Sequence, residues 1–146
     1  MTFYVDASAI VAVVASEPTS ALVDKLIRET SSTTFVSDFA MVECSAALAK
    51  NSRVKGRTMH EADNVYVELD AWSLVMAEQV DITSRDVADA TTFVRRSGLA
   101  LRAPDAIHIA AARRLGATLL TLDRGMARAA TILGVSCINP ADDQAA

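Results

Sequence analysis

Short apolar segments of strand-forming residues alternate along this chain with longer helical segments, and this alternation constrains the fold most. Strands are expected at residues 2–5, 34–37, 79–82, 117–122 and 135–139. Strands that alternate with helices form a mostly parallel sheet with helices on both faces. The chain is therefore predicted to be an α/β protein, a three-layer α/β/α sandwich around a mostly parallel, roughly five-stranded sheet.

The segments between these strands have helical spacing and recognisable ends. Helices are expected at residues 7–17, 19–28, 39–50, 59–76, 84–96, 104–115 and 124–134. Asp38 is predicted to cap the third helix, Thr83 or Ser84 the fifth, and Pro104 to be the first residue of the sixth. We expect a single domain over residues 1–146, with a frayed tail from about residue 140.

Composition excludes several classes of protein. Apolar residues make up 51% of the 146 residues, which excludes a disordered chain, and two cysteines are too few for a disulfide scaffold or a four-cysteine zinc site. The apolar N-terminal segment has no basic leader and contains Asp6, and no window is long enough to span a membrane. A cytoplasmic protein is expected. Its net charge of −4 means that a polyanionic substrate would require bound cations or local basic patches.

Four acidic residues from distant parts of the sequence are predicted to meet at one edge of the sheet. Asp6 and Asp123 directly follow the first and fourth strands. Glu43 lies within about two turns of the start of the helix that follows the second strand. Asp105 lies in the first turn of the helix that leads back to the fourth strand. All four carboxylates should lie at the carboxyl ends of the strands, where α/β sheets bind ligands.

A cluster of four carboxylates favours a bound cation. Like charges about 4 Å apart repel by roughly 4 kcal/mol at an effective dielectric constant of 20. Oxygen ligands without an accompanying set of Cys or His favour Mg²⁺ or Mn²⁺ over Zn²⁺. Such ions activate water for in-line attack on a phosphodiester, so the residues predict metal-assisted phosphodiester hydrolysis.

Four segments, YVDASA, MVECSAAL, LRAPDAIHIAAARRLGATLLTLD and VSCINP, together resemble the PIN domain family, and more narrowly the VapC-type ribonuclease toxins. The resemblance covers essentially the whole chain. It implies that the acidic positions Asp6, Glu43, Asp105 and Asp123 are the metal-binding and catalytic residues, with the hydroxyl residues Ser8 and Thr121 in support. Many relatives carry a further acid after the last Asp, where this chain has Arg124, Gly125 and Met126, so a second metal is expected to be weakly held or absent.

The resemblance also implies an activity and partners. The implied activity is that of a Mg²⁺- or Mn²⁺-dependent endoribonuclease that leaves a 5′-phosphate. The implied partners are a second copy of the chain, in a homodimer, and a small VapB-like antitoxin that inhibits the enzyme. The early helices and the helix at residues 59–76 are the candidate surfaces for these protein contacts. A PIN nuclease that acts in RNA processing rather than as a toxin is the alternative within the family.

Candidate RNA contacts come from basic residues. Arg102 lies near the acidic edge, and Lys50, Arg53, Lys55 and Arg57 form a run without acids. A solvated helix end is the alternative interpretation of this run. His108 follows Asp105 by three residues, which allows a metal ligand or a general base, although a packed histidine is more common at such a position.

Three of the four acids also have a structural alternative, since Asp6 and Asp123 can cap helices and Asp105 can interact with a helix dipole, whereas a carboxylate at Glu43, among apolar residues, would need a partner. Two other enzyme classes fit poorly. A phosphoacceptor receiver would need a Lys late in the chain, whereas the last Lys is Lys55, and a phosphatase with an Asp nucleophile would need a second Asp where Ser8 stands. A non-catalytic binding module on the same fold is the remaining alternative.

Overall fold

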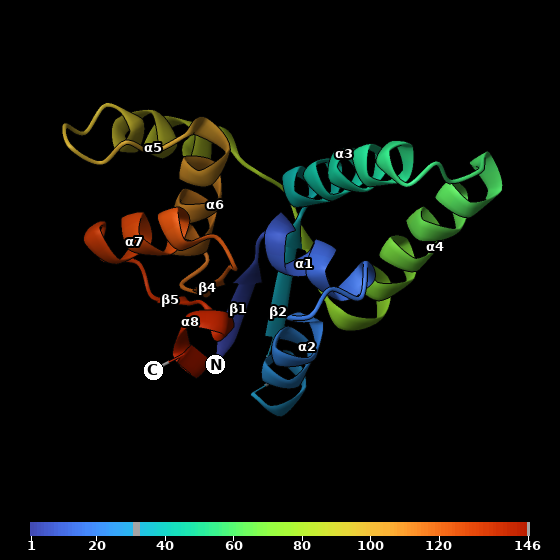
Figure 1. The fold of residues 1–146 in the computed structure, drawn as a ribbon. Helices are drawn as coiled ribbons and strands as arrows, with labels where there is room; N and C mark the ends of the chain where they lie inside the picture. Colours follow the sequence, from blue (N-terminus) through green and yellow to red (C-terminus); the bar gives the residue numbers. More distant parts are fainter. Residues whose placement is uncertain (31–32, 146) are drawn as a thin grey trace.

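The centre of the structure, a computed structural model, is a parallel β-sheet (Figure 1). Residues 1–30 and 33–145 are described. Within them the sheet has five strands in the order β3-β2-β1-β4-β5, and every pairing is parallel. The strands are β1 (Thr2–Val5), β2 (Thr33–Ser37), β3 (Glu78–Val80), β4 (Thr118–Leu120) and β5 (Cys137–Ile138). The strand order reverses between β1 and β4, so the edge of the sheet beyond these two strands is the expected ligand-binding position.

Helices cover both faces of the sheet, which confirms the predicted α/β class. They are α1 (Ala7–Val14), α2 (Ser20–Glu29), α3 (Asp38–Val54), α4 (Met59–Met76), α5 (Ser84–Val94), α6 (Ala103–Arg114), α7 (Arg124–Ile132) and α8 (Pro140–Ala145). In Figure 1, α5, α6 and α7 lie to one side of the strands, and α1 to α4 lie to the other.

Each face of the sheet has its own apolar core. Successive residues of a strand point to opposite faces, and in β1 Tyr4 packs against α5, α6 and α7 whereas Phe3 and Val5 pack against α1 to α4. In β4, Leu119 and Leu120 divide between the two cores in the same way. The result is three layers, as the alternation of strands and helices predicts.

Several element ends differ from the sequence prediction. The cap of α3 is Ser37 rather than Asp38, because Ser37 Oγ accepts the Ala40 N–H at 3.0 Å. Asp38 Oδ1 instead accepts the backbone N–H groups of Phe39 and Ile82. Because the Ile82 N–H bonds to the Asp38 side chain and not to a neighbouring strand, β3 ends at Val80 and not at the predicted residue 82.

Two further differences concern the end of the third helix and the start of the sixth. The third helix runs to Val54, beyond the predicted residue 50, because its buried face continues through Ser52. Pro104 is the second residue of α6 and not the first. The predicted capping by Thr83 is present, since Thr83 Oγ1 accepts the Asp86 N–H and the Asp86 carboxylate accepts the Thr83 N–H.

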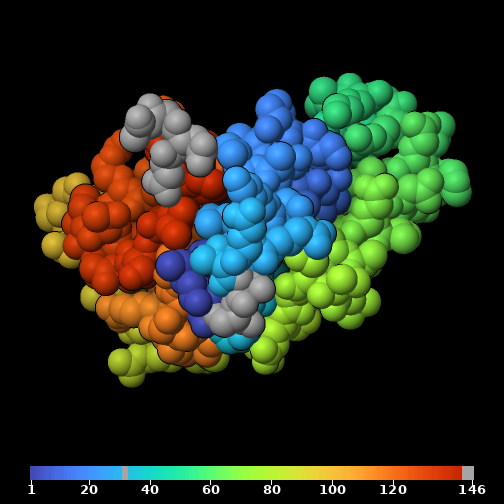
Figure 2. Space-filling model, turned by 90° about the horizontal axis from the view of Figure 1, so that it is seen from below, coloured from blue at the N-terminus to red at the C-terminus, as the bar shows by residue number. Residues whose placement is uncertain are grey.

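Residues Pro140–Ala145, within the segment expected to be a tail, form α8. The Ala141 N–H donates to Asn139 Oδ1 at the start of this helix, and Arg124 Nε donates to Asp142 at 2.9 Å. The helix packs against α2. Figure 2 shows the blue N-terminal helices between the green segment of α3 and α4 and the orange and red C-terminal segments. Across the described part of the chain, no helix combines the length and hydrophobicity that a membrane span requires.

Replacement of Arg114 by Met is expected to destabilise the domain by about 2 kcal/mol at neutral pH. Arg114 Nε and Nη2 donate to the buried carboxylate of Asp86 at 2.8 and 3.0 Å and join α6 to α5. Burial alone would raise the pKa of Asp86, but the bonds from Arg114 and Thr83 lower it below its ordinary value of 3.8. The stabilisation is therefore present above pH 3.8 and is lost as the pH falls through the lowered pKa.

Urea denaturation at neutral and acidic pH measures this difference. Arg28→Met is the matched control, because Arg28 forms an exposed ion pair with Asp24 within α2 and its loss should cost less than about 0.5 kcal/mol. Equal losses for the two variants would contradict a stabilising role of the Arg114–Asp86 pair.

Candidate active site

Asp6 lies at the carboxyl end of β1, where the chain turns into α1. Its side chain is 2% exposed and accepts hydrogen bonds on both oxygens. Ser8 Oγ donates to Oδ1 and Oδ2 at 2.8 and 3.0 Å, Thr121 Oγ1 donates to Oδ2 at 2.7 Å, and the Ala9 N–H donates to Oδ1 at 3.1 Å. Asp6 thus caps α1, as its structural alternative predicts, and also faces the end of β4.

The pKa of Asp6 is raised above its ordinary value. Burial is the main cause, and the hydrogen bonds from Thr121, Ser8 and Ala9 offset only part of it. A buried carboxylate of this kind gains from a nearby cation, which would favour its ionised form.

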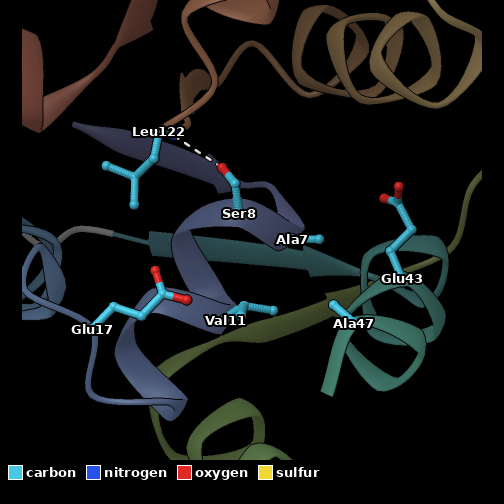
Figure 3. Close-up of a pocket in the computed structure, with 7 residues that line it drawn as sticks. All are labelled: Ala7, Ser8, Val11, Glu17, Glu43, Ala47 and Leu122. Carbon is cyan, nitrogen blue, oxygen red and sulfur yellow. Dashed lines mark hydrogen bonds between the residues drawn. The ribbon is translucent and has the colours of Figure 1, made fainter. Parts of the chain in front are cut away.

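The residues after β4 are held against Asp6 by hydroxyl groups. Ser8 Oγ lies 3.3 Å from Thr121 Oγ1 and accepts the Leu122 N–H at 3.0 Å (Figure 3). Thr121 Oγ1 also accepts the Asp123 N–H at 3.0 Å. Asp123 Oδ1 in turn accepts the Met126 N–H and caps α7. The structure therefore places Ser8 and Thr121 between the backbone of β4 and the Asp6 carboxylate.

Asp105 and Asp123 face the same cation. Arg102 Nε lies 3.4 Å from Asp105 Oδ2, and Arg102 Nη2 lies 3.7 Å from Asp123 Oδ2. The pKa of Asp105 is raised, mainly by burial; the charge of Arg102 lowers it in part, whereas the charge of Asp123 raises it further. Two carboxylates from α6 and the β4–α7 turn thus share one largely exposed guanidinium.

Glu43 lies on α3 with its carboxylate directed toward α6. His108 Nε2 and Glu43 Oε1 form a hydrogen bond between the two helices. The Glu43 side chain is 29% exposed, and His108 is buried. His108 is therefore packed, as the more common alternative for such a histidine predicts, and it also contacts a predicted site residue. Its position three residues after Asp105, one helical turn along α6, was the sequence signal for a histidine near the site, and the contact with Glu43 had no signal in the sequence.

The four predicted acids lie at the carboxyl edge of the sheet, but they are not arranged as a metal-binding site. Within residues 1–30 and 33–145, no three His, Cys, Asp or Glu side chains form a group that could hold a metal ion as they stand. Asp6 accepts bonds from hydroxyls, Glu43 contacts His108, and Arg102 lies against Asp105 and Asp123. The oxygen donors fit Mg²⁺ or Mn²⁺ chemically, and binding would require the carboxylates to approach one another more closely.

Two hollows flank the acids. One, of about 380 Å³, lies between α1 and α3, and Glu17 and Glu43 stand at its opposite sides in Figure 3. Glu17 was not among the predicted site residues. The other, of about 350 Å³, lies between the 98–102 segment and α7. Its lining includes Asp105, Asp123 and two arginines, Arg102 and Arg128. The acidic edge is thus open to solvent on two sides.

The predicted basic run lies away from the acids. Lys50 and Arg53 are in the last turns of α3, and Lys55 and Arg57 follow it. At 1.5 Å per residue, Arg53 lies about 15 Å along the helix from Glu43. Of the basic residues singled out from the sequence, Arg102 is the one that the structure brings to the carboxylates.

The strand order reverses between β1 and β4, and we call the carboxyl edge at this point the switch point of the sheet. Carboxylates that follow β1 or come from α3, α6 and the β4–α7 turn lie there. The protein is thus an α/β protein with a candidate cation-binding site. A model of the PIN domain matches residues 3–132, and the chain belongs to the PIN domain family. A search of curated proteins finds no match.

Solved structures share this fold at low sequence identity. A chain of FitAcB from Neisseria gonorrhoeae is 16% identical, with a TM-score of 0.73 over 94% of this chain and 97% of that one. A chain of VapBC2 from Rickettsia felis, solved with a DNA fragment from its promoter, is 17% identical, with a TM-score of 0.71 over 94% and 98%. VapC20 from Mycobacterium tuberculosis, described as a toxin that cleaves the sarcin–ricin loop, is 18% identical, with a TM-score of 0.70 over 94% and 97%.

Proposed function

We propose that this protein is a metal-dependent endoribonuclease and the toxin of a type II toxin–antitoxin pair. The carrying observation is the placement of Asp6, Glu43, Asp105 and Asp123 at the switch point of a PIN fold. VapC20, described as a toxin that cleaves the sarcin–ricin loop, has the same fold, and this supports a nucleolytic toxin with an RNA substrate here. We expect this activity to be cytoplasmic.

The acids would hold Mg²⁺ or Mn²⁺. When bound, such an ion activates water and neutralises charge that develops on the phosphodiester. The protein's own groups orient the donors: Ser8 and Thr121 fix the Asp6 carboxylate, and the Asp123 backbone is held by Thr121. Arg102, largely exposed at the same edge, is suited to contact an RNA phosphate once a metal has taken over the neutralisation of Asp105 and Asp123.

Protein partners are the second part of the proposal. VapBC2 and FitAcB are named as two-component assemblies, and this supports a cognate VapB-like antitoxin for the present chain. Helix α4 exposes Met59, Val67, Leu74 and Val75, which are 64 to 82% accessible. Large apolar side chains exposed along one helix favour a protein contact, and we assign this surface to a homodimer or the antitoxin. Light scattering of the purified chain, alone and with the antitoxin, tests both assignments.

Cleavage of a structured RNA pool tests the enzymatic part. With Mg²⁺ or Mn²⁺ we expect cuts that carry 5′-phosphate ends, and with EDTA we expect none. Cleavage that persists in EDTA would contradict metal dependence. Cleavage confined to precursor RNAs, without growth arrest on expression in cells, would instead support the role in RNA processing.

Neutralising the basic run is expected to weaken RNA binding without slowing cleavage at saturating RNA. Lys50, Arg53, Lys55 and Arg57 lie too far along the chain from Glu43 to contact the reacting phosphate, but they can bind flanking phosphates. For single-stranded RNA, each phosphate that is no longer neutralised should reduce the slope of log K against log salt by about 0.7. Binding titrations at several salt concentrations measure this slope, and an unchanged slope would assign the run to solvent.

A further inference from the structure

A chain of buried polar groups runs from the sheet to Glu43. Tyr4 Oη on β1 lies 2.7 Å from Ser37 Oγ and 2.7 Å from His108 Nδ1. On the other side of the imidazole, His108 Nε2 bonds to Glu43 Oε1. Tyr4, Ser37 and His108 are all buried, at 0 to 1% exposure. The chain thus connects β1, the start of α3, α6 and the predicted site residue on α3.

If His108 is neutral, only one assignment of donors and acceptors is consistent along the hydrogen bonds from Ser37 through Tyr4 and His108 to Glu43. Ser37 Oγ accepts the Ala40 N–H and donates its own hydrogen to Tyr4 Oη. Burial raises the pKa of Tyr4, so its hydroxyl keeps its hydrogen and donates to His108 Nδ1. The remaining N–H of the ring, at Nε2, then points at the Glu43 carboxylate. Each donor in the chain has one acceptor, and the tautomer that serves Glu43 is the one that Tyr4 favours.

Packing fixes the plane of the imidazole as well as its tautomer. The ring of Tyr4 lies 5.6 Å from the His108 ring at an interplanar angle of 52°, and the ring of Phe39 lies 5.4 Å away at 39°. An imidazole in contact with two aromatic rings and bonded at both nitrogens has little freedom to turn.

Glu43 depends on this contact more than Asp6 depends on any one of its neighbours. Asp6 receives bonds from Ser8, Thr121 and the Ala9 N–H. Among the described residues, the Glu43 carboxylate has a hydrogen-bond partner only in His108. Because the Glu43 side chain has several rotamers and is partly exposed, loss of the His108 bond would release it to solvent.

We propose that His108 is a positioning residue that orients Glu43 toward the metal, with Tyr4 and Ser37 as its support. This inference rests on the proposed function, since it assigns a role within the same site. His108 is too deeply buried to touch RNA, so it acts through Glu43 and is not itself a catalytic residue. Hydrogen-bond partners behind metal ligands typically contribute 10- to 100-fold to metal affinity.

Two amide replacements test the proposal with matched chemistry. The Nε2 group of Gln reaches the position of His Nε2, so His108→Gln keeps a donor for Glu43. The shorter His108→Asn places its amide near Tyr4 and gives up the bond to Glu43. The readout is the Kd for Mn²⁺, measured by electron paramagnetic resonance on the full chain without RNA, with circular dichroism to show that each variant is folded.

We expect His108→Asn to raise the Kd for Mn²⁺ by about 10- to 100-fold and His108→Gln to stay within about 3-fold of wild type. In a Glu43→Gln background, His108→Asn should have no further effect. Three outcomes would overturn the proposal. They are equal Mn²⁺ affinities for folded His108→Asn and wild type, an equal loss of Mn²⁺ affinity in His108→Asn and His108→Gln, and the same loss for His108→Asn in the Glu43→Gln background. If His108→Asn does not fold, a wild-type Kd in Tyr4→Phe combined with a 10-fold loss in His108→Gln would overturn it. Wild-type protein that binds no Mn²⁺ would refute the proposed function itself, and the inference with it.

Discussion

Asp6→Asn and Asp105→Asn are each expected to reduce RNA cleavage by more than about 100-fold while the fold is retained. Both side chains lie at the carboxyl edge of the sheet, beyond the paired strands β1 and β4, and an amide replaces one anionic oxygen with a nitrogen that cannot bind Mg²⁺. With its oxygen at the Oδ1 position the amide still accepts from Ser8 Oγ and from the Ala9 N–H, so α1 keeps its cap, while its NH2 group faces Thr121 Oγ1.

Initial rates of cleavage with saturating Mg²⁺ measure the effect, and thermal denaturation shows that the variants are folded. Asp63→Asn is the matched control, because Asp63 is an exposed acid on α4 and its replacement should leave the rate unchanged. A folded Asp6→Asn protein that cleaves RNA at the wild-type rate would remove this residue from the proposed mechanism.

The edge at which the acids gather could be predicted because chain direction alone determines it. A residue directly after a parallel strand must lie at the carboxyl edge, and this places Asp6 and Asp123 without any knowledge of side-chain contacts. The same argument places Asp105, since a helix that returns to a parallel strand begins at that edge. Chain geometry also determines which of the two cores a strand residue joins, because successive residues of a strand point to opposite faces of the sheet.

Contacts between side chains could not be predicted in this way. His108 and Glu43 are separated by 65 residues, and only the crossing of α3 and α6 brings them together. His108 is packed, as is more common for a histidine on a helix, but the helical pattern gave no sign of its bond to Glu43. The capping oxygen of α3 was misassigned because Ser37 and Asp38 are both good caps, and the bond from the Ile82 N–H to Asp38 is a tertiary contact.

The basic run shows that charge patterning alone does not locate a cation relative to the acidic edge. Four cations without acids between residues 50 and 57 satisfy the sequence pattern of a nucleic-acid contact. The helix α3, however, runs on to Val54 and carries them away from the acidic edge. Arg102, a single cation in the sequence, is held beside Asp105 and Asp123 by the segment that enters α6. Position relative to a strand end was therefore the better predictor.

Without metal the acidic edge is expected to lower the stability of the protein as pH rises. Burial raises the pKa of Asp6 above 3.8, and it raises that of Asp105 in the same direction. A group whose pKa is raised in the folded state stabilises the fold most below its unfolded pKa, and this stabilisation is lost as pH rises through the folded value. The opposite behaviour of Asp86 removes stability only below pH 3.8, so the two effects separate on the pH axis.

Mn²⁺ is therefore expected to raise the thermal stability of the wild-type protein at neutral pH. At a concentration 100 times its Kd, a ligand that binds only the folded state adds about 2.7 kcal/mol, which corresponds to roughly 5 to 10 °C for a domain of this size. The gain should disappear with EDTA, and it should be small at a pH low enough to protonate Asp6 and Asp105, because metal and protons then compete for the same oxygens.

Thermal denaturation of wild type and Asp6→Asn across this pH range measures both effects. The variant should start with a higher metal-free Tm at neutral pH, since it no longer buries an ionised carboxylate, and should gain little from Mn²⁺. An equal Mn²⁺ gain in both proteins would show that the ion binds elsewhere than at the end of β1.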